Sequence, residues 1–385
     1  MKKQFLILGS YFLVAVLATL MTLGLVYLEG GLVPSKLDQL EGLIRERFIG
    51  EADPTALEDA AAEAMVKATG DRWSYYISAE EYERYAEQMA NEYVGVGITI
   101  LQQEGNVGFL ILEVTPGSPA EEAGLQSQDL IVKVSDTDVR EMGVESIRDL
   151  VKGKEGTFVE IAVLRQGETR TFQVERRKVQ TPVATWELLE HGIGLVTIEN
   201  FDDRCAEETI GAIRAAMENG AEKLIFDVRN NPGGYAHELV KVLDHLLPEG
   251  ELFRMVFYDG EENVDYSDEA YLDVPMAVLV NSGSYSAAEF FAAALQEYEA
   301  AVIVGEQTSG KGYFQTTIHL NDGSAVALSV GKYYTPSGKS LAEVGITPDR
   351  IVETDEETET ELYYGTLEPE EDPYIREAVT LLKNR

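Results

Sequence analysis

The chain contains few cysteines, histidines and basic residues. Cys205 is the one cysteine, so the chain cannot form an internal disulfide, a pattern compatible with any compartment. The 31 lysines and arginines are outnumbered by 68 aspartates and glutamates, and the formal net charge is −37. Such a charge argues against nucleic acid as a partner. The sequence also lacks a His-Glu-x-x-His zinc motif, and we predict neither a metal nor another cofactor.

The N-terminus carries a long apolar run. Phe5 to Leu28 is uncharged over about two dozen residues, which is long enough to span a bilayer core. A small-x-small cleavage site is not evident at its end, and the preceding Lys2 and Lys3 favour the cytoplasmic side. We therefore predict an uncleaved single-pass anchor in the cell membrane, with the rest of the chain extracytoplasmic. A buried helix of a soluble protein is the alternative.

The stretch from Asn281 to Gln315 combines turns with chemically useful side chains. The apolar run Met276–Val280 predicts a buried strand, after which a turn leads into a helical pattern from Ser286. A second predicted strand, Ala301–Val304, is followed by a glycine-rich loop with Lys311. Because adjacent strands would bring their ends together, we expect the serine and the lysine to approach one another.

Ser286 has two interpretations. It begins the capping-box pattern Ser286-Ala-Ala-Glu289, in which it would be only an N-cap. A serine at a helix start can also be a nucleophile, since the free N–H groups there stabilise a developing oxyanion. None of the four histidines lies in this stretch, so Lys311 is the candidate base. Burial must lower its pKa by about three units before it can accept a proton at neutral pH, whereas a solvated loop lysine would do nothing.

The spacing of these residues resembles the signature of the C-terminal processing peptidases, also called tail-specific proteases. The resemblance implies that Ser286 is the nucleophile, Lys311 the general base and Gln315 the residue that holds the lysine. The motif residues are Asn281-x-x-Ser-x-Ser286-x-x-Glu289, Gly305-Glu-x-Thr-x-Gly-Lys311-Gly and Gln315.

Two positions depart from the family pattern. Tyr285 stands beside the nucleophile, where small residues are usual, and Glu297 stands where some members carry an aspartate. Neither change removes a reacting group. Tyr285 would narrow the pocket beside the scissile bond, so fine specificity is what it affects.

Gly305 to Lys311 also matches the beginning of a phosphate-binding P-loop. The next position should be Ser or Thr to hold magnesium, but it is Gly312. The residues that follow predict a strand, whereas a P-loop needs a helix N-terminus directed at the phosphates. Nucleotide binding is therefore the weaker interpretation.

A second loop is expected to contribute to the same site. The predicted strand from Lys223 ends in Arg229-Asn-Asn-Pro-Gly233-Gly234, for which a tight turn is the simplest reading. The family resemblance implies an oxyanion hole formed by the N–H groups of Gly233 and Ala287. Gly234 could replace Gly233, because a sequence cannot orient an amide. Asp227 and Arg229 are expected to fix the loop.

Residues 93–178 resemble a PDZ domain, with short predicted strands, glycine turns and a helix at Val144–Val151. In a PDZ domain a glycine-rich loop offers N–H groups to the terminal carboxylate of a peptide, and the next strand pairs with that peptide. Val114-Thr-Pro-Gly-Ser-Pro119 and Ala123-Gly-Leu125 support the resemblance, whereas Gln128 replaces a usual glycine. The peptide-binding residues that it implies are Val94, Gly95, Val96, Gly97 and Ile98.

The predicted architecture is a mixed α/β (α+β) multidomain protein. At the C-terminus, Glu353 to Asp372 is acidic without a basic residue and is expected to be solvated, and Asp372 to Arg385 is expected to form a short amphipathic helix. The predicted parts are a transmembrane anchor (1–31), a helical region (32–92), a PDZ domain (93–178), a serine protease core (179–352) and an acidic linker with the C-terminal helix (353–385). For the helical region the family resemblance implies a homodimer, and a solvated helical linker is the alternative.

The predicted function is that of a membrane-anchored serine endopeptidase. It would bind proteins with apolar C-termini through the PDZ domain and cleave them near that end. A non-catalytic scaffold that binds protein C-termini is the alternative, and retention of serine, lysine and glutamine at the expected offsets argues against it.

Overall fold

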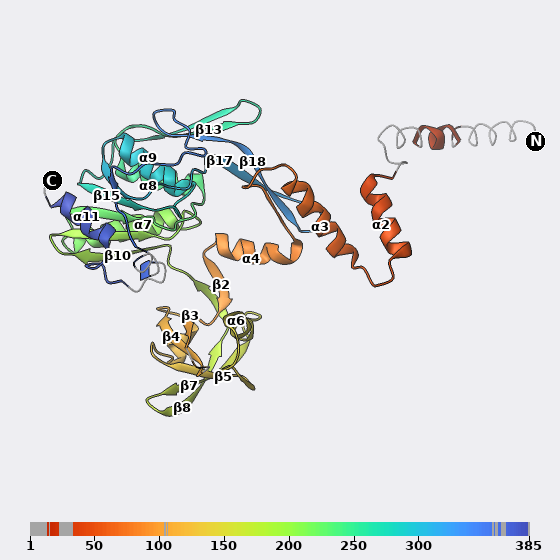
Figure 1. Cartoon of the computed structure of the whole chain (residues 1–385), viewed down its shortest axis with the longest axis horizontal. Coiled ribbons are helices and arrows are strands. Elements are labelled where there is room, and N and C mark those ends of the chain that lie inside the picture. Colours follow the sequence, from red (N-terminus) through yellow and green to blue (C-terminus); the bar gives the residue numbers. More distant parts are fainter. Residues whose placement is uncertain are drawn as a thin grey trace, which may run out of the picture. The chain divides into compact units, whose positions relative to one another are not determined.

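The computed structural model describes residues 14, 16–22, 34–103, 105, 107–355, 358, 361–362 and 367–383 (Figure 1). They fall into two compact units, Met1–Tyr76 and Ile77–Arg385, and the chain passes from one to the other at β1 (Tyr75–Ile77). Most of the predicted anchor, Phe5–Leu28, lies outside the described residues. Within the described part of the chain, no helix is both long and apolar enough to cross a membrane.

The described residues of the first unit include a helical stretch at 16–22 and the helices α2 (Lys36–Arg47) and α3 (Pro54–Lys67). Ser35 caps α2 in a capping box with Asp38, and Asp53 caps α3, whose first residue is a proline. Neither α2 nor α3 buries a residue. Leu37, Leu40 and Leu43 of α2 are therefore exposed within this unit.

In the second unit, α4 (Ala79–Met89) follows β1. It leads into β2 (Glu92–Gly95), which pairs with β9 (Arg177–Gln180). The segment between β2 and β9 in the sequence forms a separate sheet in the order β3-β4-β5-β7-β8, in which β6 pairs with β5. Its elements are β3 (Ile98–Gln102), β4 (Phe109–Val114), α5 (Pro119–Ala123), β5 (Leu130–Val134), β6 (Thr137–Asp138), α6 (Val144–Val151), β7 (Phe158–Arg165) and β8 (Glu168–Glu175).

The larger core is built on a sheet in the order β10-β11-β12-β15-β16-β19, parallel except for β10. Buried side chains of its strands alternate between two apolar clusters, one on each face. Helices α7, α8 and α9 cover one face, and α11 covers the other (Figure 1). The elements are β10 (Ala184–Leu189), β11 (Ile193–Ile198), α7 (Cys205–Glu218), β12 (Lys223–Asp227), α8 (Ala236–Leu246), β15 (Met276–Val280), α9 (Ala287–Glu297), β16 (Ala301–Gly305), β19 (Arg350–Ile351) and α11 (Pro373–Leu382).

A second sheet of the core supports the loop that follows β16. Strand β18 (Ala325–Tyr334) pairs with β17 (Tyr313–His319) on one side and with β13 (Gly250–Phe257) on the other. Strand β14 (Glu262–Ser267) completes a hairpin with β13. Strand β17 of this sheet thus begins shortly after the predicted base Lys311, at Tyr313.

The predicted mixed α/β multidomain architecture is confirmed. The expectation of a solvated acidic segment up to Asp372 is wrong at its last residue, which is only 4% exposed. Asp372 is buried because it caps α11, whose Ile375, Ala378 and Leu382 complete the apolar cluster on that face of the sheet.

Candidate active site

The candidate nucleophile lies where β15 passes into α9. Ser286 directly precedes the helix, is 5% exposed and has a φ of 60° and a ψ of −126°. Non-glycine residues rarely adopt a positive φ, and such strain persists where surrounding contacts hold it. Here Ser284 donates its hydroxyl hydrogen bond to the Val228 carbonyl (2.7 Å), and the Tyr285 N–H donates to the Asn231 carbonyl (3.1 Å).

A buried carboxylate joins the turn of Ser286 to the loop of Lys311. The Glu289 side chain has no exposed surface. Its Oε2 accepts hydrogen bonds from the backbone N–H groups of Ser286 (3.0 Å) and Lys311 (2.9 Å). Its Oε1 accepts from the Thr308 hydroxyl (2.5 Å) and the Gly310 N–H (2.8 Å). Burial raises the pKa of Glu289 above its ordinary value, although these hydrogen bonds act in the opposite direction.

Glutamate 289 therefore does more than the sequence suggested. It was expected only as the second half of a capping box, and its carboxylate does bind the Ser286 N–H. Its contacts with Thr308, Gly310 and Lys311 were missed, because a local motif does not report which distant loop lies above it. The motif from Gly305 to Lys311 was the sequence signal that placed this loop in the candidate active site.

Lys311 lies in the loop between β16 and β17. Its Nζ lies over the ring of Tyr285, 5.7 Å from the ring centroid, so the residue that departs from the family pattern contacts the candidate base. Glycines let this loop pack closely. A side chain at Gly312 would come within 2.4 Å of the Ala342 backbone nitrogen. Gln315 lies in β17, where its amide donates to the Ser329 hydroxyl (2.9 Å) and the Tyr313 carbonyl (3.2 Å). Its predicted contact with the lysine stays a prediction.

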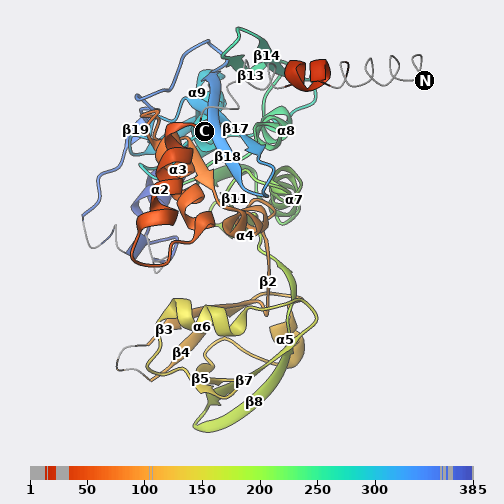
Figure 2. The ribbon, with the colours of Figure 1, turned by 90° about the vertical axis from the view of Figure 1, so that its right-hand side faces the viewer.

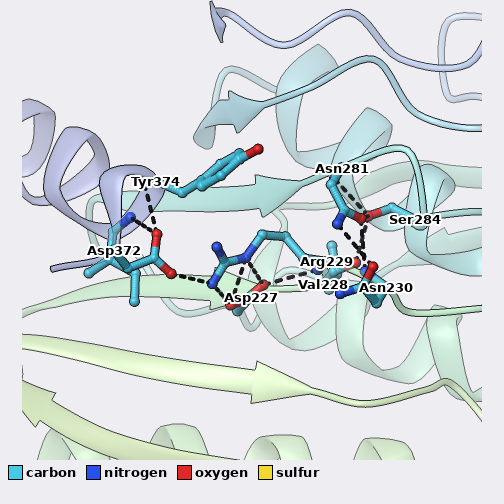
Figure 3. Close-up of polar contacts among 9 residues, drawn as sticks. Asp227, Val228, Arg229, Asn230, Asn281, Ser284, Asp372 and Tyr374 are labelled. Atoms are coloured by element: carbon cyan, nitrogen blue, oxygen red, sulfur yellow. Dashed lines mark hydrogen bonds and ion pairs between the residues drawn. The ribbon is translucent and has the colours of Figure 1, made fainter. Parts of the chain in front are cut away.

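The loop after β12 lies against the nucleophile turn. Asn230 and Asn281 exchange two hydrogen bonds, from the Asn230 N–H (2.9 Å) and from the Asn281 amide (3.0 Å), as Figure 3 shows. Arg229 forms an ion pair with Asp227, and a second one with Asp372 at the start of α11 (2.8 Å). Burial opposes the charge on Arg229, but the two carboxylates hold the pKa of its guanidinium above the ordinary value.

The structure places Gly233 beside the candidate nucleophile. A side chain there would come within 2.7 Å of Ser286 Cβ and 2.8 Å of the Ala287 nitrogen. The Gly233 N–H itself donates to Asn231 Oδ1 (2.8 Å), a contact that the sequence did not indicate. Gly234 has a φ of 152° and forms an isolated β-bridge with Phe201, and a side chain there would come within 2.3 Å of the Phe201 backbone. The oxyanion role predicted for Gly233, or for Gly234 in its place, stays a prediction.

Four of the five predicted peptide-binding residues, Gly95, Val96, Gly97 and Ile98, line a cavity of about 550 Å³, and Val94 is not among its lining residues. Figure 2 shows the elements around it, β2, β3 and α6. Val94 and Gly95 end β2, Gly97 has a φ of 83°, and Ile98 begins β3. A side chain at Gly97 would come within 2.3 Å of Ser118 Cβ, so this turn requires glycine. The far wall consists of Val144, Arg148 and Val151 of α6, and Lys152 follows them.

Comparisons with known proteins agree with this organisation. Residues 192–352 match the model of peptidase family S41, and residues 110–165 match a PDZ domain. A probable CtpA-like serine protease of Staphylococcus saprophyticus is 30% identical over 372 residues, which cover 91% of this chain and 75% of that protein. A protein of the same description from Staphylococcus aureus strain COL is 31% identical over 325 residues, covering 83% of this chain and 65% of that one.

A solved structure of similar fold supports the architecture alone. The crystal structure of a putative S41 protease from Bacteroides fragilis aligns with a TM-score of 0.56 at 17% identity, covering 91% of this chain and 98% of that one.

Proposed function

Because this chain is a serine-type peptidase of family S41, one of the C-terminal processing peptidases with a PDZ domain, we propose that it cleaves proteins near their C-terminus with a Ser286–Lys311 pair. One observation carries the proposal. A single oxygen, Oε2 of Glu289, accepts hydrogen bonds from the backbone of both residues. The two predicted reacting residues are thereby held beside one another.

The reaction would proceed through an acyl-enzyme. Neutral Lys311 takes the proton of the Ser286 hydroxyl as its oxygen attacks the peptide carbonyl, and Gln315 orients the amine. N–H groups of Ala287 and Gly233, or Gly234 in its place, stabilise the oxyanion. The protonated lysine then gives its proton to the leaving amine, and water hydrolyses the acyl-enzyme by the same route.

The PDZ domain would select the substrate. The cavity between β3 and α6 has the position in which an added peptide strand pairs with β3, with its terminal carboxylate at the Gly95–Gly97 turn. Ile98, Ile100 and Val144 line the cavity and favour an apolar tail. Substrates are therefore proteins that present an accessible apolar C-terminus.

The N-terminal apolar run would anchor the enzyme in the cell membrane, with the catalytic part extracytoplasmic. A homodimer is proposed through α2, whose Leu37, Leu40 and Leu43 are 44%, 53% and 50% exposed. Three large apolar side chains on one helix face are typical of a surface that another chain covers. Sedimentation of the parent and of a chain with Leu40→Glu and Leu43→Glu tests the dimer, since the variant should sediment as a monomer.

The test of the activity uses a chain starting at about Leu32 and a loosely folded protein with an apolar C-terminus. The parent should cleave it, and Ser286→Ala and Lys311→Ala should each reduce kcat by at least about a thousandfold while still binding the tail. Ser282→Ala, an exposed serine of the same turn, should cleave like the parent. Tail binding without cleavage by any chain would favour the scaffold alternative.

A further inference from the structure

The C-terminal helix α11 begins with a buried aspartate that faces the loop after β12. Asp372 Oδ1 accepts hydrogen bonds from the N–H groups of Tyr374 (2.8 Å) and Ile375 (3.3 Å) and so caps the helix. Its other oxygen, Oδ2, lies 2.8 Å from Nη2 of Arg229 (Figure 3). One carboxylate thus serves the last helix of the chain and a residue of the active-site loop.

The Arg229 side chain is held in place by contacts from Asp227 and from the C-terminal helix α11. Its side chain is 12% exposed and is bound by both carboxylate oxygens of Asp227. The ring of Tyr374, on α11, lies 5.0 Å from its guanidinium carbon. The Tyr374 hydroxyl donates to Glu306, just beyond β16, which fixes the ring in turn. The C-terminal helix therefore supplies two of the contacts that hold this arginine.

From Arg229 the contacts continue directly to the nucleophile turn. The preceding Val228 carbonyl accepts the Ser284 hydroxyl bond, and the following Asn230 exchanges two hydrogen bonds with Asn281. Asn231 then accepts from the Tyr285 N–H. The loop thus contacts the nucleophile turn on both sides of Arg229, through Val228 before it and through Asn230 and Asn231 after it. A change in the position of Arg229 would alter the spacing between Gly233 and Ser286.

We propose that Asp372 is a positioning residue for peptide hydrolysis, acting through Arg229 on the loop 228–234 that stabilises the oxyanion. The inference rests on the proposed function, because it assumes that Ser286 attacks and that this loop contributes an N–H donor. α9 carries the nucleophile on one face of the central sheet, and α11 fixes the oxyanion loop from the other face. The site is then complete only when the last helix of the chain is docked.

Two substitutions separate this role from helix capping. Asp372→Asn and Asp372→Ser keep a side-chain oxygen that can accept the N–H bonds of α11, but both remove the charge that faces Arg229. The matched control is Asp129→Asn in the PDZ domain. That aspartate is 1% exposed and also forms a buried ion pair, with Arg165 at 2.6 Å. All chains are compared in full length on a short quenched peptide without a recognition tail.

The decisive readout is the preference for a transition-state mimic. A peptide aldehyde forms a hemiacetal with the Ser286 hydroxyl, and its former carbonyl oxygen occupies the oxyanion hole, whereas the matching peptide alcohol cannot add to serine. The inhibition ratio is the inhibition constant of the alcohol divided by that of the aldehyde. It reports the oxyanion hole and does not depend on the folded fraction of a variant. A lowered ratio therefore cannot result from reduced stability.

We expect Asp372→Asn and Asp372→Ser to lower kcat about tenfold with unchanged KM, less than the loss of a whole oxyanion donor, and to lower the inhibition ratio equally. Asp129→Asn should change neither. Adding Asp372→Asn to Arg229→Gln should cause no further loss, because both act through one contact. Variants of Asp372 with the parental kcat and ratio would overturn the proposal, as would additive losses with Arg229→Gln. A parent insensitive to Ser286→Ala would instead refute the proposed function.

Discussion

Replacing Glu289 tests whether the active site depends on one buried carboxylate. Glu289→Ala leaves the N–H groups of Ser286, Gly310 and Lys311 without their acceptor. Each buried N–H left without an acceptor costs about 1–3 kcal/mol of stability. We also expect kcat to fall about a hundredfold, because a displacement of about 1 Å between reacting groups is sufficient for that loss.

Glu289→Gln should be milder, for a reason visible in the geometry. If the amide nitrogen replaces Oε2, it faces the N–H groups of Ser286 and Lys311, which are donors only. If it replaces Oε1, it faces the Gly310 N–H and the Thr308 hydroxyl, and the hydroxyl can turn and accept. The second orientation leaves one N–H unsatisfied, at about 1–3 kcal/mol, and keeps the bonds to Ser286 and Lys311. The loss of kcat should then stay within about tenfold.

The assay combines chemical denaturation with kcat on a short peptide, below the unfolding midpoint of every variant. Glu238 is the matched control, since it is also the third residue of a helix, α8, is 5% exposed and accepts the Ala206 N–H. Glu238→Ala should lower stability without lowering kcat per folded molecule. If Glu289→Ala behaved in the same way, the argument that this carboxylate aligns the nucleophile with the base would be refuted.

Further predictions concern one residue each. Burial, with a contribution from Asp203, raises the pKa of Asp202 to about 7, so the native state retains a proton that the unfolded chain loses near its ordinary pKa. Stability from this group therefore falls as pH rises between those values, and Asp202→Asn should raise the free energy of unfolding by up to about 4 kcal/mol at pH 8 but little at pH 4. Gly233→Ala, which would press against Ser286, should lower kcat about a hundredfold and leave tail binding unchanged in a fluorescence titration. Leu382→Ala removes a fully buried side chain of α11 and should cost about 2–5 kcal/mol in urea unfolding.

Sequence patterns predicted the elements better than the contacts between them. The apolar run Met276–Val280 is the observed strand β15, and Val144–Val151 is the observed helix α6. Both depend on the burial of neighbouring residues, which periodicity reports directly. The bond from the Gly233 N–H to Asn231 was not predictable, because Asn-x-Gly is equally consistent with an amide turned toward the substrate. Asp372 was misjudged for a related reason, since composition assigned it to the acidic run and only the packing of α11 reveals that it is buried.

Glu289 and Asp372, whose contacts the sequence did not reveal, share a physical property. Glu289 and Asp372 are both buried carboxylates at the start of a helix, where free N–H groups stabilise negative charge. In each, one part of the carboxylate satisfies its own helix and the remainder binds a loop of another segment, the Lys311 loop for Glu289 and the Arg229 loop for Asp372. A helix cap that also binds a loop couples the formation of that helix to the position of the loop. The geometry of this site is therefore determined by how two helices on opposite faces of one sheet begin, so a substitution at either start should change kcat before it changes the affinity for the protein tail.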